Sequence, residues 1–379
     1  MTDLPDRPPR FVLSMVIAVC FATAFILATP GFVLLMAAHW GYGGGQLGLF
    51  VTADSIGSAA GPLLLSGLMS RLPVRRIVVG GALGFAAGNA LTALHPDFGV
   101  ILASRVLSGT SSGVIAALGV RYLALSAQSE RNLAWMTIGQ TLYSALLLTL
   151  VLPTVGDAAK APGAFGLLAL QALLCLPLVT LFRRDDPLTA DHRGAGLVQH
   201  GSSAMCLLAT LSLNTAVGIV WTFVGHQGIA AGLSDAATDR VLGLANLLSI
   251  AGCAMVPWAV RSGRLYSSAI AALSLCAVAA LALALAPQPG LFVAASIVYV
   301  VAWAAAITLM MTAMPGHDPV GRYVMLIPTA LCIGNGVGAA IGGALVESHG
   351  TSPAFGVAAG CCALSAGLFA VLRQRSGHA

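Results

Sequence analysis

Long apolar stretches separated by short polar segments run along nearly the whole chain. A membrane-spanning helix needs about 20 mostly apolar residues, and stretches of that kind recur twelve times. They lie at residues 11–36, 46–69, 76–94, 98–122, 134–154, 163–182, 203–226, 237–260, 265–286, 290–313, 322–346 and 352–372. Strands of a membrane barrel would instead alternate polar and apolar residues over about ten positions. The pattern therefore predicts an all-α integral membrane protein with twelve transmembrane helices.

The composition supports this assignment. Of the 379 residues, 58% are hydrophobic and only 8% are charged, whereas a soluble domain carries about 25% charged residues. The net charge of +5 does not indicate a nucleic-acid partner, because the basic residues lie in short clusters between apolar stretches. The eight cysteines fall almost entirely within apolar stretches and form no CxxC pair, which predicts free thiols and no metal. No phosphate-binding GxxxxGK[ST] sequence is present, and we expect no cofactor.

The distribution of basic residues predicts the orientation. With the N-terminus inside, the inner loops and tails hold nearly all the arginines, while the outer loops hold Lys160 and, at the margin of a span, Arg240. We therefore expect a multi-pass protein of a bacterial cytoplasmic (inner) membrane, with both termini in the cytoplasm. The lipid bilayer is its solvent, and we expect a monomer.

Two halves of similar layout are predicted. The longest polar stretch, 183–202, lies near the midpoint with six spans on each side, which indicates a cytoplasmic linker. When the second span is laid over the eighth, Asp54 lies opposite Asn246, and the same offset places Arg105 opposite Ile297. A shared offset close to half the chain favours a duplicated six-helix unit. We therefore expect two pseudo-symmetric six-helix bundles, residues 1–182 and 203–379.

Two local motifs sharpen this picture. The loop after the second span carries Gly67, Arg75 and Arg76, and the fourth span carries Arg105 followed by Gly109. With the twelve spans, these features resemble the major facilitator superfamily, whose loop motif is G-x-L-A-D-R-x-G-R-R and whose fourth-span motif is R-x-x-x-G.

This resemblance implies the fold of that superfamily, transport by alternating access and a fourth-span arginine linked to proton coupling. The acidic position of the loop motif is arginine here, so its gating role does not carry over. The glycine- and proline-rich fifth-span motif of the superfamily's drug–proton antiporters is absent, which weakens the interpretation as a multidrug exporter.

Two ionisable residues, Asp54 and Arg105, sit well inside the predicted spans, and the second half offers no equivalent deep charge. A charge at the bilayer centre costs about 2.5–3.5 kcal/mol on insertion scales, so each needs a partner, a water-filled cavity or a function. At 1.5 Å per residue, both lie about 10–12 Å below the outer helix ends. Our hypothesis is that they form a charge pair that opens when Asp54 binds a proton. A static structural pair is the alternative.

Polar and aromatic residues inside other spans are candidates for substrate contact. Amides and aromatic rings orient an organic solute without a large desolvation cost, although each could equally serve helix packing. The candidates are Gln140, Tyr143, Asn214, Trp221, Asn246, Tyr299, Trp303 and Asn335.

Together these features predict a secondary active transporter of a small organic solute, with proton coupling and a slight preference for export. Proton-coupled uptake of a nutrient or organic anion is the alternative, and Arg105 favours an anion only if Asp54 does not neutralise it. A non-transporting membrane receptor or assembly factor on the same scaffold is the alternative of another class. A membrane-embedded enzyme is disfavoured, because clustered catalytic motifs such as HExxH are absent.

Overall fold

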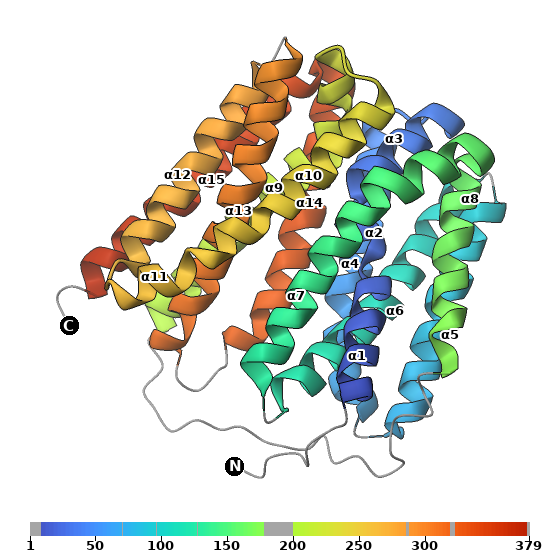
Figure 1. The fold of residues 1–379 in the computed structure, drawn as a ribbon, viewed down its shortest axis with the longest axis horizontal. Coiled ribbons are helices and arrows are strands. Elements are labelled where there is room, and N and C mark those ends of the chain that lie inside the picture. The colour runs from blue at the N-terminus through green and yellow to red at the C-terminus, as the bar shows by residue number, and fades with distance from the viewer. Residues whose placement is uncertain are drawn as a thin grey trace. The chain divides into compact units, whose positions relative to one another are not determined.

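The computed structural model describes residues 9–69, 71–95, 97–126, 128–177, 200–285, 288–318 and 323–376. Every regular element in these ranges is a helix (Figure 1). The chain forms two compact units, one of Met1–Leu35 with Ala53–Ala190 and the other of Met36–Thr52 with Asp191–Ala379. The predicted linker 183–202 lies outside the described residues except for its last three, which begin a helix.

The helices of the first half pack mainly through α5 with α6, α5 with α8, and α1 with α6. In chain order they are α1 (Pro9–Ala22), α2 (Ala24–Leu27), α3 (Thr29–Trp40), α4 (Gly44–Met69), α5 (Val74–Leu94), α6 (Phe98–Ala124), α7 (Ser129–Leu146), the π-helical turn η1 (Leu147–Val151) and α8 (Leu152–Leu174).

In the second half, α9 packs extensively against α14 and α15, and α13 packs against α10 and α12. The helices are α9 (His200–Ala230), α10 (Asp235–Ala254), α11 (Val256–Arg261), α12 (Leu265–Ala284), α13 (Pro289–Ala313), α14 (Ile327–His349) and α15 (Thr351–Ser376), with short 3-10 turns η3 (Met314–Gly316) and η4 (Val324–Leu326).

The first predicted span is broken into α1, α2 and α3. Pro30 lacks an amide hydrogen and its ring conflicts with the carbonyl four residues earlier, so the hydrogen-bond ladder fails near Ala28. Thr23 and Thr29 turn their hydroxyl groups back onto the carbonyl groups of Val19 and Phe25, at 2.8 and 3.0 Å. Thr29 also donates to the carbonyl of Ile26 at 3.1 Å, the group that would otherwise accept the amide hydrogen that Pro30 lacks.

The fifth and sixth predicted spans form one helical stretch with a sharp kink. Lys160 has φ 56° and ψ −158°, which separates two helical arms of α8. Pro162 follows two residues later, where proline restricts the preceding backbone to extended conformations. The π-helical turn η1 ends two residues before Pro153, whose missing amide hydrogen interrupts the ladder.

Within the described residues, ten continuous helical stretches are long and apolar enough to cross a membrane, and α1 is a shorter apolar helix. One of the ten, Arg131–Leu174, contains the kink at Lys160 and carries both the fifth and the sixth predicted spans. The predicted all-α membrane fold is therefore confirmed, and the helices cover all twelve predicted apolar stretches as far as the structure describes them.

Small residues let α4 approach α6 closely. A methyl group on Gly109 would meet the backbone carbonyl of Asp54, and one on Gly113 would meet that of Ser58. On the α4 side, a methyl group on Gly61 would lie 2.5 Å from the carbonyl carbon of Gly113. The two backbones are thus in direct contact, as small-residue seams allow in membrane proteins.

The first residues of α4 make a second seam, with α14, and both sides of it belong to the second unit. Thr52 donates a hydrogen bond to the carbonyl of Gly336 at 2.8 Å, and the Glu347 carboxylate accepts one from the amide of Gly45 at 2.6 Å. A carboxylate at the start of a helix satisfies a free amide and interacts favourably with the helix dipole. The helix α4 therefore contributes residues to both units.

His317 lies just after η3 and is buried. Its ring nitrogen Nε2 is 2.8 Å from the Tyr266 hydroxyl, and its carbonyl accepts a hydrogen bond from Ser203 at 3.0 Å. Burial lowers the pKa of His317 from its usual 6.5. Although histidines in predicted loops are expected to be solvated, this one joins α9, α12 and the end of α13.

We expect Gly109→Ala to lower the stability of the purified protein by about 1–3 kcal/mol, because overpacking forces the two helices apart. The change should appear as a lower midpoint of thermal unfolding in detergent. Gly80→Ala is the control, since no atom lies within 4 Å of the added methyl group. Equal midpoints for the two variants would contradict the α4–α6 seam.

We expect His317 to make the protein less stable in acid. Because the folded-state pKa is below the unfolded one, its contribution is complete above about pH 6.5 and is lost as the pH falls through the lowered value. His317→Gln should therefore flatten the fall in unfolding temperature between about pH 7 and about pH 5. His349→Gln, which changes an exposed histidine, should leave the wild-type slope.

Candidate functional site

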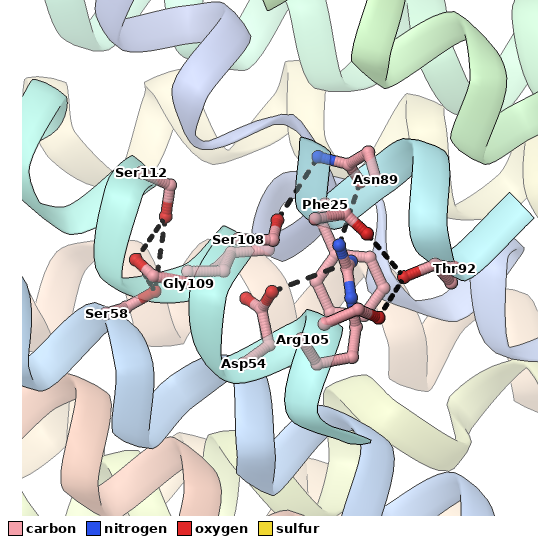
Figure 2. Close-up of polar contacts among 12 residues, drawn as sticks. Phe25, Asp54, Ser58, Asn89, Thr92, Arg105, Ser108, Gly109 and Ser112 are labelled. Carbon is pink, nitrogen blue, oxygen red and sulfur yellow. Dashed lines mark hydrogen bonds and ion pairs between the residues drawn. The ribbon is translucent and has the colours of Figure 1, made fainter. Parts of the chain in front are cut away.

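Asp54 of α4 and Arg105 of α6 form a buried ion pair. Arg105 Nη1 lies 3.6 Å from Asp54 Oδ1, and the arginine and the aspartate are 0% and 3% exposed (Figure 2). The pairing expected from their equal depth is therefore present in the first unit. At 3.6 Å the contact is longer than a well-formed N–H···O hydrogen bond, so it is mainly a Coulomb attraction.

Neutral groups surround the guanidinium of Arg105 on its other sides. Nη2 donates a hydrogen bond to Asn89 Oδ1 at 2.9 Å. The guanidinium carbon lies 5.4 Å from the ring centroid of Phe25 and 5.1 Å from that of Phe165. Both rings are within range of a favourable cation–π interaction. Arg105 is thus held by α4, α5 and two aromatic rings together.

A polar network fixes Asn89 in turn. Its side-chain nitrogen donates to the Phe85 carbonyl at 2.8 Å and to Ser108 Oγ at 3.1 Å. One turn along α5, Thr92 shares a 2.7 Å hydrogen bond with Ser104 of α6. Figure 2 shows these contacts on the α6 face that carries Arg105. The Asn89 side-chain carbonyl is therefore aimed at the guanidinium before any substrate binds.

The local sequence explains why the pair forms. Arg105 and Gly109 are four residues apart and share one face of α6, and Gly109 packs on the backbone of Asp54. Past it, Ser58 donates to the Gly109 carbonyl at 3.3 Å, and Ser112 donates to the same carbonyl at 2.9 Å (Figure 2). The glycine brings α4 close, and the arginine one turn away then reaches the carboxylate.

The two charges of the pair are unequally supported. A buried carboxylate is tolerable when it is paired, and removing one partner of a buried pair leaves an uncompensated charge. Asp54 has Arg105 as its only charge partner within the described residues, whereas Arg105 also contacts Asn89 and two rings. Asp54 therefore depends on Arg105 more than Arg105 depends on Asp54.

The first-unit substrate candidates Gln140 and Tyr143 share a face of α7. Gln140 donates to Thr23 Oγ1 at 3.1 Å, in the break between α1 and α2. The ring centroid of Tyr143 lies 5.3 Å from that of Phe21. Beside them, Ser144 donates to the Leu27 carbonyl at 2.7 Å. The structure thus brings this pair to the broken first span rather than to the Asp54–Arg105 pair.

In the second unit, Trp221 of α9 and Trp303 of α13 come together, with ring centroids 6.0 Å apart. Asn214 is buried and donates to the Thr210 carbonyl at 3.0 Å, while half-buried Asn246 donates to the Leu242 carbonyl at 3.3 Å. Each side-chain amide nitrogen therefore donates to a carbonyl group of its own helix. Their side-chain oxygens accept no hydrogen bond from the described part of the chain.

Two further candidates of the second unit lie at helix contacts. Tyr299 is 1% exposed and within electrostatic range of Cys276 and Cys362, which places it toward α12 and α15. The backbone of Asn335 in α14 lies where a methyl group on Gly218 would stand. The buried Tyr299 hydroxyl has no hydrogen-bond partner among the described residues, and the Asn335 backbone joins α14 to α9.

The loop-motif residues occupy helix ends. Gly67 lies in the last turn of α4, and Arg75 and Arg76 lie in the first turn of α5. Arg76 is exposed and Arg75 is half-buried.

Sequence reasoning missed two kinds of residue. The first kind comprises the three residues that hold Arg105, namely Asn89, Phe25 and Phe165. Of these, Asn89 left a signal in the sequence, because it is an asparagine inside the apolar stretch 76–94. The second kind is Asp239 of α10, which is only 5% exposed although it does not lie deep in its predicted span. It stands at the third position of the predicted span 237–260, so sequence alone placed it at the edge.

These helices and this buried ion pair define a multi-pass membrane protein with a polar site inside its first bundle. The sequence model of the Major Facilitator Superfamily matches residues 14–327. The chain belongs to that superfamily, and it is accordingly a membrane transporter by family.

Solved structures support the fold. The nucleoside transporter NupG superposes with a TM-score of 0.76 at 11% identity, covering 96% of this chain and 98% of that one. A point mutant of NupG gives 0.75 at 13% identity, with 96% and 99% covered. The human organic anion transporter MFSD10 (TETRAN) gives 0.68 at 17% identity, with 96% and 100% covered. No curated protein sequence matches the chain.

We expect Arg105→Met to destabilise the protein by about 3–5 kcal/mol, because it leaves the Asp54 carboxylate buried and unpaired. Asp54→Leu should cost less, because Asn89, Phe25 and Phe165 still support the charge of Arg105. The double variant should recover much of that loss, since it buries no charge. A double-mutant cycle on unfolding midpoints in detergent measures the coupling. Additive losses in the double variant would show that the two side chains do not interact.

Proposed function

We propose that this protein is a proton-coupled secondary active transporter of a small organic solute. It works in a bacterial cytoplasmic membrane by alternating access, with both termini in the cytoplasm. The observation that carries the proposal is the buried Asp54–Arg105 pair, 3.6 Å apart between α4 and α6. The family supplies the transport activity, and the pair supplies a titratable contact between helices.

The coupling step follows from the contacts around the pair. A proton on Asp54 removes its negative charge and with it the attraction to Arg105. Arg105 stays in place because Asn89, Phe25 and Phe165 still hold it. The electrostatic hold on α4 is then weaker than before, and the helix is freer to change its packing. Release of the proton restores the attraction and resets the helix.

The substrate is better matched by a neutral or weakly polar solute than by an anion. Asp54 neutralises Arg105, so an anion at this point would compete with a carboxylate already in place. In the second unit, the Trp221–Trp303 pair offers aromatic surface to a flat ring. A nucleoside, the solute named for NupG, combines a flat base with hydroxyl groups and is a first compound class to test.

Export is the slightly preferred direction of transport in this proposal, with proton-coupled uptake of a nutrient or organic anion as the alternative. MFSD10 is named as an organic anion transporter, so organic anions are tested as well. A receptor or assembly factor without flux is the third candidate.

Candidate solutes are found by thermal-shift screening of the purified protein with nucleosides and organic anions. Any stabilising solute is then followed into and out of proteoliposomes.

We expect Asp54→Asn to abolish accumulation driven by a pH gradient while solute exchange at equal concentrations continues. Exchange needs the solute site and the conformational change, whereas accumulation also needs the proton site. Asp157→Asn, which changes an exposed acid of α8, is the matched control and should accumulate solute normally. Undiminished gradient-driven accumulation by Asp54→Asn would refute the coupling role. No flux of any stabilising solute would favour the receptor instead.

A further inference from the structure

The second unit contains a buried acid that the proposed coupling step does not use. Asp239 lies in the second turn of α10 and is 5% exposed, and its Oδ1 has no hydrogen-bond partner among the described residues. One turn earlier, Asp235 begins the helix and is exposed. Residues four apart in a helix lie on the same face, so an exposed carboxylate and a buried one stand in line along α10.

A histidine of the neighbouring helix shares this electrostatic environment. His226 of α9 is half-buried, and its Nδ1 also has no partner among the described residues. Asp235 acts electrostatically on both His226 and Asp239. We refer to His226, Asp235 and Asp239 as the α9–α10 group.

Other charged side chains near the α9–α10 group are few. The helix α10 packs against α13, α9 and α11. On α10 itself, Arg240 is exposed. Among described residues of the packed helices, His200 begins α9 at its far end, Tyr299 lies toward α12 and α15, and Arg261 ends α11. Within the described ranges, no basic side chain forms an ion pair with Asp239, in contrast to Asp54.

An unpaired carboxylate oxygen away from water is costly, and a bound proton or cation removes that cost. Unlike Asp54, Asp239 has no arginine among the described residues to share its charge. We propose that Asp239 is a second proton-binding carboxyl group, and that the negative charge of the exposed Asp235 one turn earlier raises its affinity for the proton. The proton comes from water, and its binding converts the carboxylate to a neutral carboxylic acid. This inference rests on the proposed proton-coupled transport and adds a site in the second unit.

A carbodiimide experiment on the whole purified protein tests the site without a known substrate. The O–H bond of a protonated carboxyl group adds across a C=N bond of dicyclohexylcarbodiimide, and mass spectrometry of peptides locates the adduct. We expect dicyclohexylcarbodiimide to label Asp239. The yield of the adduct should fall at least several-fold as the pH is raised. A water-soluble carbodiimide should instead label exposed Asp235 and spare Asp239.

A matched variant sharpens the test. Asp235→Asn removes a negative charge one turn away, so Asp239 should lose its proton more readily and its labelling profile should shift to lower pH. The conservative Asp239→Asn should remove the adduct while keeping the unfolding midpoint near that of the wild type. Asp157→Asn should leave the Asp239 profile unchanged.

Three results would overturn the inference. The Asp239 peptide could be recovered unlabelled at every pH, or be labelled equally at all of them. Alternatively, sodium ions could suppress labelling of Asp239 at fixed pH while choline, an organic cation, does not. That result would show that Asp239 binds a metal cation instead of a proton. Labelling of Asp54 without Asp239 would remove the second site alone. The coupling role of Asp54 is tested separately by the gradient-driven accumulation of Asp54→Asn, so the two proposals can fail independently.

Discussion

The cost of placing charge in an apolar environment governs the functional region of this protein. Arg105 is completely buried, and it is tolerated because four separate groups share its charge: a carboxylate, an amide oxygen and two aromatic rings. They come from four different helices, which the glycine seam and the packing of α5 on α6 and α8 bring together at this point. The packing of α4, α5 and α6 around one guanidinium is therefore a chemical requirement as well as a geometrical one.

The balance between the two members of the pair is unequal. Arg105 has several supports, while Asp54 depends chiefly on Arg105. A group with one support is sensitive to its loss, and a group with several is not. The same comparison distinguishes Asp54 from Asp239, which has an acid rather than a base as its electrostatic neighbour. The buried carboxyl group thus has a base beside it in the first bundle and an acid beside it in the second.

The fold class could be predicted from the sequence because membrane helices are specified by length and apolar composition, which are local properties. Asp54 and Arg105 stood out for the same reason, since charge inside an apolar stretch is rare. The environment of Arg105 could not be predicted, because Phe25 and Phe165 are far apart in the sequence and only tertiary packing shows that both face one guanidinium. The burial of Asp239 was missed because a residue near a span's start is buried or exposed according to its neighbours.

The helix α4 passes from one unit to the other within a single turn. Thr52 belongs with α14 through its bond to Gly336, and Ala53 and Asp54 belong with the bundle that contains α6. A helix of 26 residues with one internal proline at Pro62 behaves largely as a stiff rod on either side of that point. The contact of Gly45 with Glu347 lies in the second unit, and the Asp54 carboxylate lies two residues past the last residue of α4 that belongs to that unit. A single helix thus carries the buried acid of one unit and an anchoring contact of the other.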